Sequence, residues 1–159
     1  MKQETIQSLV TVCQMEELSQ EDQQLVELAK EATFRSYARY SNFHVGAALR
    51  TEDGEVVIGC NQENAAFPAG LCAERTALFA AGAQYPDKAV DVIAIAARNQ
   101  SGDFTPIPIS PCGSCRQVLV ETEQRFSHPV RIILYGARYI YQLDSIRHLM
   151  PLSFTEEQL

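Results

Sequence analysis

The sequence has little basic charge for its acidic content. Thirteen lysine and arginine residues stand against twenty aspartate and glutamate residues, which gives a formal net charge of −7 at pH 7. Nucleic-acid phosphates and anionic membrane surfaces attract proteins through a basic footprint. The charge balance therefore argues against both a nucleic-acid partner and a membrane partner.

Long apolar runs are also missing. The first eighteen residues, MKQETIQSLVTVCQMEEL, interleave apolar side chains with Gln, Glu and Ser, so they lack the continuous apolar stretch of a signal peptide. No other segment is long and apolar enough to span a bilayer. We therefore expect a cytoplasmic protein, in a compartment where cysteine thiols stay reduced.

The sequence also lacks an even number of cysteines. Five cysteines cannot all pair, which excludes a complete disulfide framework. In a reducing compartment a C-x-x-C pair indicates a metal site, redox chemistry or coincidence. One such pair occurs in SPCGSCRQVL, residues 110–119. The cysteines are Cys13, Cys60, Cys72, Cys112 and Cys115.

What is present is enough apolar material for one core. Hydrophobic residues make up 46% of the 159 residues, which suits a single domain. We expect that domain to span residues 19–159. Residues 1–18 are expected to form an amphipathic N-terminal extension, with apolar side chains on one side. These are Ile6, Leu9, Val10 and Cys13.

Helical and strand signals alternate along the domain. Ser19 can cap a helix, with Asp22 at the capping-box distance, and two β-rich runs flank Asp53-Gly54, the strongest short hairpin signal. Further helices are expected from Cys72 and from Cys112, buried strands at residues 91–98 and 130–136, and a short helix before Pro151. Continuous apolar strands joined by helices predict an α/β fold whose mixed sheet is covered on both faces.

Three of the cysteines fall at helix starts. Cys72 begins one helix, and Cys112 and Cys115 begin another, each after a strand-and-loop segment, so both helix starts can open at the same end of the sheet. A helix N-terminus lowers the pKa of a thiol. Three thiolates converging there would form a soft site suited to zinc.

The number of ligands separates a structural zinc site from a catalytic one. Structural zinc is usually closed by four protein ligands, whereas catalytic zinc has three and a water molecule. No fourth ligand stands beside the three cysteines in the sequence, but Glu74 lies two residues after Cys72. A carboxylate beside a metal-bound water can move protons. The alternatives are Glu74 as an ordinary first-turn acid and Cys60 as a fourth ligand of a structural site; we expect Cys13 to be only an apolar residue.

These residues carry a family resemblance. Cys72-Ala73-Glu74 followed by Pro111-Cys112-x-x-Cys115 resembles the signature of the zinc-dependent nucleoside and base deaminases, whose three-cysteine zinc chemistry is well described. More narrowly, the chain resembles the cytidine deaminases. The matching stretches are YSNFHVGAAL, NQEN, CAERTA, SPCGSCRQVL and LMPLSF, in the family's order from about residue 40 to residue 154.

The resemblance implies a fold, a cofactor and a reaction. The fold would be a three-layer α/β/α arrangement with a mixed sheet of about five strands. Cys72, Cys112 and Cys115 would ligate one Zn²⁺ per chain, and Glu74 would act as the general acid and base. The reaction would be hydrolytic deamination of cytidine and deoxycytidine to uridine and deoxyuridine, with release of ammonia, in pyrimidine salvage.

The resemblance also implies substrate contacts and an assembly. Asn61 and Glu63 would hydrogen-bond the sugar hydroxyls, and Phe43 would pack against the pyrimidine. The backbone around Ala73 would read the edge of the base. Phe154 matches a phenylalanine that reaches a neighbouring subunit's pocket in this family, which typically forms homotetramers.

Two arginines would offset the excess negative charge of such a site. Three thiolates around Zn²⁺ leave a net charge of about −1, which would weaken the metal's acidity. Arg75 and Arg116 each directly follow a motif residue. Guanidinium donors to the sulfurs would withdraw charge from them. The resemblance supports this role for Arg75, and the sequence alone suggests it for Arg116.

The sequence departs from the family at two places and leaves rival functions open. The stretch AAFPAG, residues 65–70, replaces a more usual tyrosine-containing segment, and residues 1–18 exceed the common family length. Among substrates, Glu63 in N-x-E-N disfavours blasticidin S and would repel a 5′-phosphate. Outside this enzyme class, the rivals are a non-catalytic zinc-stabilised binding module and a C-x-x-C redox protein, which would need neither Cys72 nor Glu74.

Overall fold

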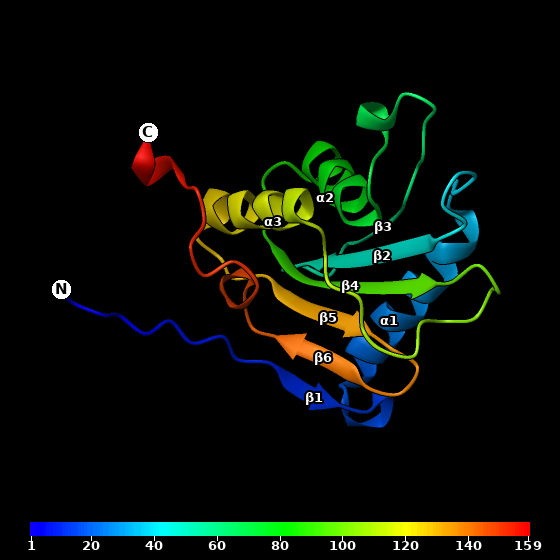
Figure 1. Ribbon diagram of the computed structural model, residues 1–159, viewed down its shortest axis with the longest axis horizontal. Helices are drawn as coiled ribbons and strands as arrows, with labels where there is room; N and C mark the ends of the chain where they lie inside the picture. The colour runs from blue at the N-terminus through cyan, green and yellow to red at the C-terminus, as the bar shows by residue number, and fades with distance from the viewer.

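A six-stranded sheet forms the middle layer of the molecule (Figure 1). The computed structural model describes the backbone of residues 1–159 and all side chains except that of Glu157. The strand order is β1-β6-β5-β4-β2-β3. The strands are β1 (Thr11–Cys13), β2 (His44–Thr51), β3 (Val56–Cys60), β4 (Val90–Arg98), β5 (Arg131–Tyr135) and β6 (Ile140–Leu143).

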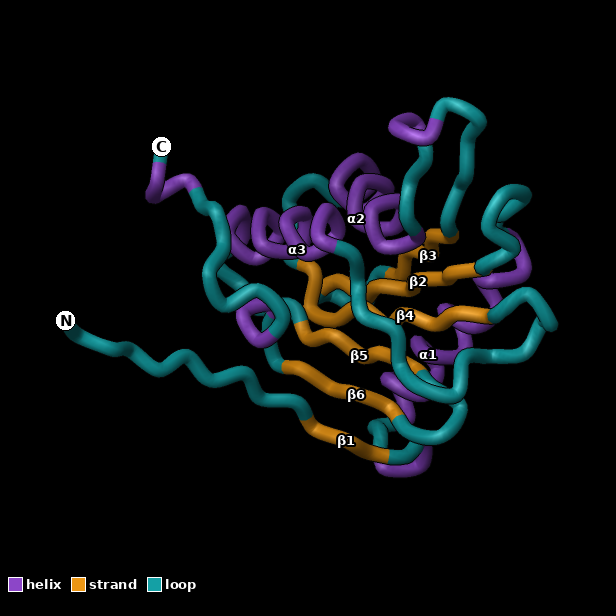
Figure 2. Tube along the Cα trace, viewed as in Figure 1, coloured by secondary structure: helices purple, strands orange, loops and turns teal.

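Three α-helices cover the two faces of the sheet, so the expected three-layer α/β fold is confirmed (Figure 2). They are α1 (Gln20–Ala32), α2 (Ala73–Gln84) and α3 (Gly113–Phe126). Single turns of 3₁₀ helix occur at η1 (Met15–Glu17), η2 (Thr33–Arg35), η3 (Phe67–Ala69), η4 (Ile146–His148) and η5 (Glu156–Gln158). No described helix is both long and apolar enough to cross a membrane.

The sheet is mixed, as expected, but it has six strands where about five were predicted. β4 and β5 run parallel, and the other neighbouring pairs run antiparallel. One unforeseen strand, β1, comes from the N-terminal extension and pairs with β6 in the register Val12↔Tyr141. The boundary after residue 18 stays a prediction, although residues 11–13 lie in the sheet.

The hairpin signal and the first helix cap are both realised in the structure. Gly54 takes a φ of +95° in the turn between β2 and β3, a conformation that favours glycine over residues with a Cβ atom. Ser19 caps α1, because its hydroxyl accepts a hydrogen bond of 3.1 Å from the backbone N–H of Asp22.

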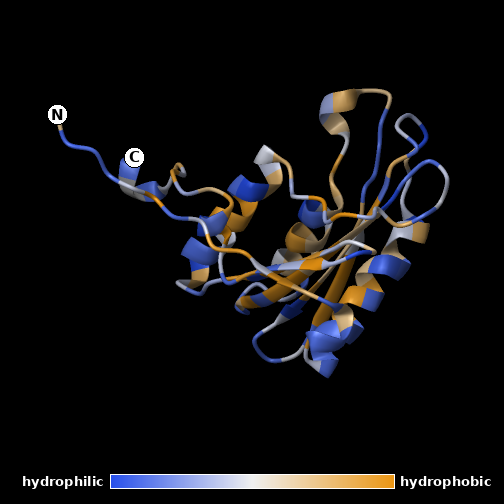
Figure 3. Cartoon of the chain, turned by 60° about the horizontal axis from the view of Figure 1, so that its bottom comes forward, coloured by the Kyte–Doolittle hydropathy of each residue, from blue (hydrophilic) through white to orange (hydrophobic). Residues whose placement is uncertain are grey.

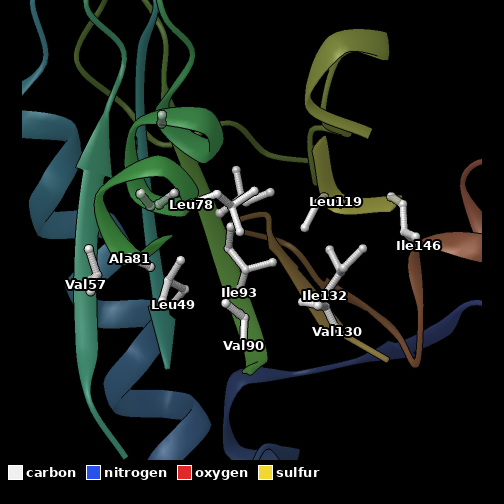
Figure 4. Packing of buried hydrophobic residues seen from close by; sticks show 14 of the residues in the cluster. Leu49, Val57, Leu78, Ala81, Val90, Ile93, Leu119, Val130, Ile132 and Ile146 are labelled. Atoms are coloured by element: carbon white, nitrogen blue, oxygen red, sulfur yellow. The ribbon is translucent and has the colours of Figure 1, made fainter. Parts of the chain in front are cut away.

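Two apolar layers hold the helices on the sheet. Helices α2 and α3 pack over β2, β4 and β5 through side chains such as Leu49, Leu78, Ile93 and Leu119, which point toward one another between the layers (Figure 4). Helix α1 packs on the opposite face through a second cluster that includes Leu25, Val26 and Ile133. Figure 3 shows the strands at the centre coloured as apolar, with hydrophilic segments toward the outside.

Glycines let helices α1 and α2 approach the strands closely. A Cβ atom at Gly46 on β2 would lie 2.1 Å from the carbonyl oxygen of Ala29 in α1. A Cβ atom at Gly59 on β3 would lie 2.5 Å from the carbonyl oxygen of Ala73 and 2.5 Å from the nitrogen of Ala77, both in α2. The second contact fixes where the first turn of α2 sits, and that turn carries the cysteine and the glutamate of the candidate site.

Candidate metal centre and active site

Two helix starts bring three cysteine sulfurs together. Cys72 is the N-cap of α2, Cys112 is the N-cap of α3, and Cys115 follows in the first turn of α3. The Sγ atom of Cys112 lies 3.8 Å from that of Cys72 and 3.4 Å from that of Cys115, and all three lie within 4.8 Å of one another.

These distances fit a tetrahedral zinc site. With Zn–S bonds of about 2.3 Å and tetrahedral angles, two sulfur ligands lie about 3.8 Å apart. The thiol donors of this cluster are also the kind that zinc prefers. The residues present therefore fit zinc, with Cys72, Cys112 and Cys115 as its ligands.

Neither of the other cysteines joins the cluster. Cys60, the alternative fourth ligand, ends β3 and accepts a hydrogen bond of 3.1 Å from Nε2 of Gln62. Cys13 ends the edge strand β1 and is buried in the apolar cluster that α1 covers. Among the described side chains, the candidate group is limited to three cysteines, which leaves one tetrahedral position for a non-protein ligand.

The sulfurs shift one another's pKa. A hydrogen bond from Cys115, with further donors in Arg75 and Cys112, lowers the pKa of Cys72 to about 5. The same hydrogen bond to Cys72, together with burial, raises the pKa of Cys115. Metal ligation requires all three thiols to lose their protons, so metal affinity at this cluster must fall in acid.

The two arginines have different partners. Arg75, one turn after Cys72 on α2, places Nη2 3.8 Å from the sulfur of Cys72, as expected for a donor to a thiolate. Arg116 instead donates from Nε to the carbonyl of Pro111 and from Nη1 to the carbonyl of Leu149, each at 2.8 Å. Arg116 thus ties the loop before Cys112 to the C-terminal segment rather than contacting the sulfurs.

Glu74 is a buried carboxyl beside the sulfurs. It lies in the first turn of α2 and is 4% exposed. Burial raises its pKa, and the negative charge of Cys72 raises it further, while a hydrogen bond from Cys115 and the charge of Arg75 act in the opposite sense. A carboxyl with a raised pKa binds a proton more readily than an ordinary carboxylate does, which suits a group that takes up and passes on protons.

A pocket of about 360 Å³ opens next to the metal cluster. Cys72 and Arg75 form one side, and the loop after β3 forms the other through Asn61 and Glu63. Tyr40 also reaches this pocket from the turn that precedes β2. The structure therefore places both predicted sugar-binding residues at a cavity that touches the metal cluster.

Asn61 and Glu63 also join the pocket to the segment before β2. The side chain of Asn61 donates to the carbonyl of Phe43 at 2.9 Å and accepts from the N–H of Val45 at 2.8 Å. Glu63 accepts from the N–H of Tyr40 at 2.6 Å. Phe43 is half-buried in this segment, where it stays a predicted contact of the base.

The remaining predicted substrate residues lie in different surroundings. Ala73 is fully buried at the start of α2, above Gly59, and the reading of the base edge by its backbone stays a prediction. Phe154 is 59% exposed on the C-terminal tail, and its carbonyl accepts a hydrogen bond of 2.9 Å from Gln117. Its predicted contact with a second subunit stays a prediction.

The divergent AAFPAG stretch forms part of the pocket rim. It contains η3, and the ring of Phe67 is 77% exposed. Phe67 packs edge-on against Tyr40, with ring centroids 6.1 Å apart, and both residues line the pocket. The aromatic pair was not predicted, although the sequence had marked this stretch as a departure from the family.

Comparison with known proteins identifies relatives over most of the chain. The profile of the cytidine and deoxycytidylate deaminase zinc-binding region matches residues 19–127. A cytidine deaminase from Halalkalibacterium halodurans is 39% identical over 137 residues, which are 86% of this chain and 96% of that protein. A probable cytidine deaminase from Dictyostelium discoideum is 34% identical over 143 residues, 89% of this chain and 90% of that one.

Solved structures show the same similarity in three dimensions. The crystal structure of a cytidine deaminase from Burkholderia pseudomallei superposes with a TM-score of 0.70 at 39% identity, covering 86% of this chain and all of that one. A cytidine deaminase from Mycobacterium tuberculosis gives a TM-score of 0.63 at 32% identity, covering 83% of this chain and 95% of that one.

Proposed function

The chain belongs to the cytidine and deoxycytidylate deaminase family, and on that premise we propose how its own residues carry out the reaction. It is a zinc-dependent enzyme that hydrolyses cytidine and deoxycytidine to uridine and deoxyuridine with release of ammonia, a reaction of pyrimidine salvage. The observation that carries the assignment of roles is the cluster of three sulfurs beside the buried carboxyl of Glu74.

The metal ligands and their neighbours prepare the site for hydrolysis. Cys72, Cys112 and Cys115 hold the ion, one per chain. When bound, zinc supplies Lewis acidity that lowers the pKa of a water molecule toward ~7. Arg75 donates toward the sulfur of Cys72 and offsets the negative charge that three thiolates bring.

Glu74 moves the protons of the reaction. It accepts a proton from the attacking water and delivers it to N3 of the pyrimidine, which makes C4 more electrophilic. After oxygen has bonded to C4, Glu74 takes the remaining proton from that oxygen and passes it to the exocyclic amine, which leaves as ammonia as the C4–N bond breaks and the C4=O bond forms. Its raised pKa suits both steps, because the carboxyl must bind a proton and then release it.

The walls of the pocket select an unphosphorylated nucleoside. Asn61 and Glu63 receive the sugar hydroxyls, Phe43 packs against the base, and the backbone at Ala73 reads the base edge. The hydrogen bond from the Ser41 hydroxyl lowers the pKa of Glu63, burial opposes it, and the backbone N–H groups of Tyr40 and Ser41 lower the pKa further, which keeps the carboxylate charged. A charged carboxylate at the sugar end repels the 5′-phosphate of a nucleotide.

Location and assembly are further parts of the proposal. A cytoplasmic protein would keep the three zinc-binding thiols reduced. A homotetramer would give the exposed ring of Phe154 a neighbouring pocket to enter, and α3 already fixes the tail through the hydrogen bond from Gln117 to Phe154. Light scattering on a size-exclusion column would test the tetramer through its mass.

A substrate panel tests the proposed function. Purified protein with a measured zinc content is incubated with cytidine, deoxycytidine, cytosine, deoxycytidylate and blasticidin S, and ultraviolet absorbance follows loss of the exocyclic amine. We expect turnover of the two nucleosides and little of the others. Turnover confined to blasticidin S would reassign the substrate, and one zinc per chain without any turnover would favour the binding module.

A further inference from the structure

A serine outside the pocket donates hydrogen bonds to a carboxylate that lines the pocket. Glu63 lines the pocket, whereas Ser41 lies on the turn between η2 and β2. The hydroxyl of Ser41 donates to Oε1 of Glu63 at 2.5 Å, and its backbone N–H donates to Oε2 at 3.3 Å. Both carboxylate oxygens of Glu63 are therefore held by one residue.

The same hydroxyl reaches the residue expected beneath the base. Ser41 Oγ accepts a hydrogen bond of 3.0 Å from the N–H of Phe43. The carbonyl of Phe43 accepts from Asn61 at 2.9 Å, so its backbone is held on both sides. A single run of hydrogen bonds thus leads from Phe43 through Ser41 to Glu63.

A hydroxyl group suits the middle of this run. A backbone N–H donates and a carboxylate accepts, so the group between Phe43 and Glu63 must accept from one and donate to the other. Serine and threonine do both, whereas alanine does neither. The adjacent Asn42 takes a φ of +52°, a left-handed conformation that turns the chain between Ser41 and Phe43.

The hydrogen bonds to Glu63 leave one acceptor position of its carboxylate free. A carboxylate has about four acceptor positions on its two oxygens. Oε2 receives the N–H groups of Tyr40 and Ser41, and Oε1 receives the hydroxyl of Ser41. One position on Oε1 remains for a substrate hydroxyl, and its direction is set by the bond from Ser41.

We propose that Ser41 is a positioning residue for sugar recognition, which orients Glu63 to accept a hydrogen bond from one ring hydroxyl of the nucleoside. The inference rests on the proposed function, since it takes the occupant of the pocket to be a nucleoside. Ser41 acts through Glu63 and has no part in moving protons at C4, which belongs to Glu74.

The test compares three nucleosides in Ser41→Ala, Ser41→Thr and the control Ser8→Ala, an exposed serine ahead of β1. In Ser41→Ala we expect KM for cytidine and deoxycytidine to rise roughly 10-fold with little change in kcat, as for one weakened hydrogen bond to a charged group. For 2′,3′-dideoxycytidine, which lacks both ring hydroxyls, kcat/KM should stay unchanged. Ser41→Thr should restore KM toward wild type.

The outcomes separate this inference from the function on which it rests. An equal loss for all three nucleosides, or a fall in kcat alone, would overturn the positioning role. The same holds if Ser41→Ala matches wild type while Glu63→Gln loses hydroxyl discrimination. Failure of wild-type protein to deaminate any nucleoside would instead overturn the proposed function. Thermal melting of each variant identifies any that fails to fold.

Discussion

Two buried carboxyl groups in this molecule occupy similar positions but behave in opposite ways. Asp22 lies in the first turn of α1 and is 5% exposed, and Glu74 lies in the first turn of α2 and is 4% exposed. The pKa of Asp22 is lowered, whereas the pKa of Glu74 is raised. Their exposed fractions and helix positions are alike, but the groups around them differ.

The partners of Asp22 are arginines. Arg131 donates to both of its oxygens, at 2.9 and 3.2 Å, and Arg50 donates at 3.2 Å. Burial alone would raise the pKa of Asp22, but the bonds and charge of Arg131, with Ser19 and Arg50, outweigh it. Asp91 lies 3.2 Å from Arg131, so the end of the sheet beneath α1 holds closely matched opposite charges.

The neighbours of Glu74 are thiols. It lies at the other end of the sheet, where β3 ends at Cys60 opposite Gly46, and Cys72 adds negative charge instead of removing it. At one end of the sheet, Asp22 holds α1 to the strands through its ion pairs. At the other end, Glu74 is a buried carboxyl that can bind a proton, and among the described side chains it has no such stabilising partners. Exchanging the two side chains for their amides tests this difference.

The largest expected effect is on turnover. Glu74→Gln removes the proton carrier without changing its size, and we expect kcat for cytidine to fall about 10³-fold or more. Zinc should remain at one per chain, because the three sulfurs are untouched. The matched change Asp22→Asn should leave kcat near wild type. Steady-state kinetics with metal analysis would decide, and a Glu74→Gln enzyme of near-normal kcat would contradict the account.

The next effect is on stability and falls on the other carboxylate. Asp22→Asn leaves Arg131 and Arg50 without their shared anion, and we expect the free energy of unfolding at pH 7 to fall by about 3 kcal/mol. Urea denaturation measures it. The exposed Asp87→Asn should change it by less than about 0.5 kcal/mol. Equal effects for the two variants would show that the ion pairs contribute little.

The glycines under the two helices sharpen the comparison. Gly46→Ala and Gly59→Ala each push a Cβ atom against helix backbone, so both should lower stability, by about 1–3 kcal/mol. Only Gly59→Ala displaces the turn that carries Cys72 and Glu74. We therefore expect kcat or zinc affinity to fall in Gly59→Ala and to hold in Gly46→Ala, as kinetics and a zinc-chelator titration would measure.

The smallest expected effect is a dependence on pH. The pKa of Asp22 is below its ordinary value of 3.8, so the stability it contributes is present above pH 3.8 and is lost as pH falls through the lowered pKa. The difference in unfolding free energy between wild type and Asp22→Asn should therefore shrink in acid. Denaturation at pH 3 and pH 7 would measure it, and a difference that grows in acid would contradict the sign.

Much of the fold could be predicted from local sequence signals. The helices have caps and apolar stripes, the long strands are apolar throughout, and Asp53-Gly54 specifies a hairpin. The short strands β1 and β6 were not predicted, because segments of three and four residues carry little periodicity. β1 pairs with β6, more than one hundred residues away in the chain, and β6 pairs with β5 on its other side.

The metal cluster could also be predicted, because helix starts at one end of a sheet converge. The roles of single polar side chains were harder, since their partners are distant in sequence. Arg116 finds the carbonyl of Leu149 33 residues away, and Ser41 finds Glu63 22 residues away. The stretch YSNFHVGAAL contains Ser41, but a role for the Ser41 hydroxyl can be inferred only from a structure that shows Glu63 beside it.

The most direct measurement is zinc-edge X-ray absorption on the purified protein. It counts the ligand atoms of the metal and separates sulfur at about 2.3 Å from oxygen or nitrogen at about 2.0 Å. The account predicts one zinc per chain with three sulfur ligands and one oxygen ligand. Four sulfurs, as Cys60 would provide, would make the site structural and contradict a position left open for a water ligand.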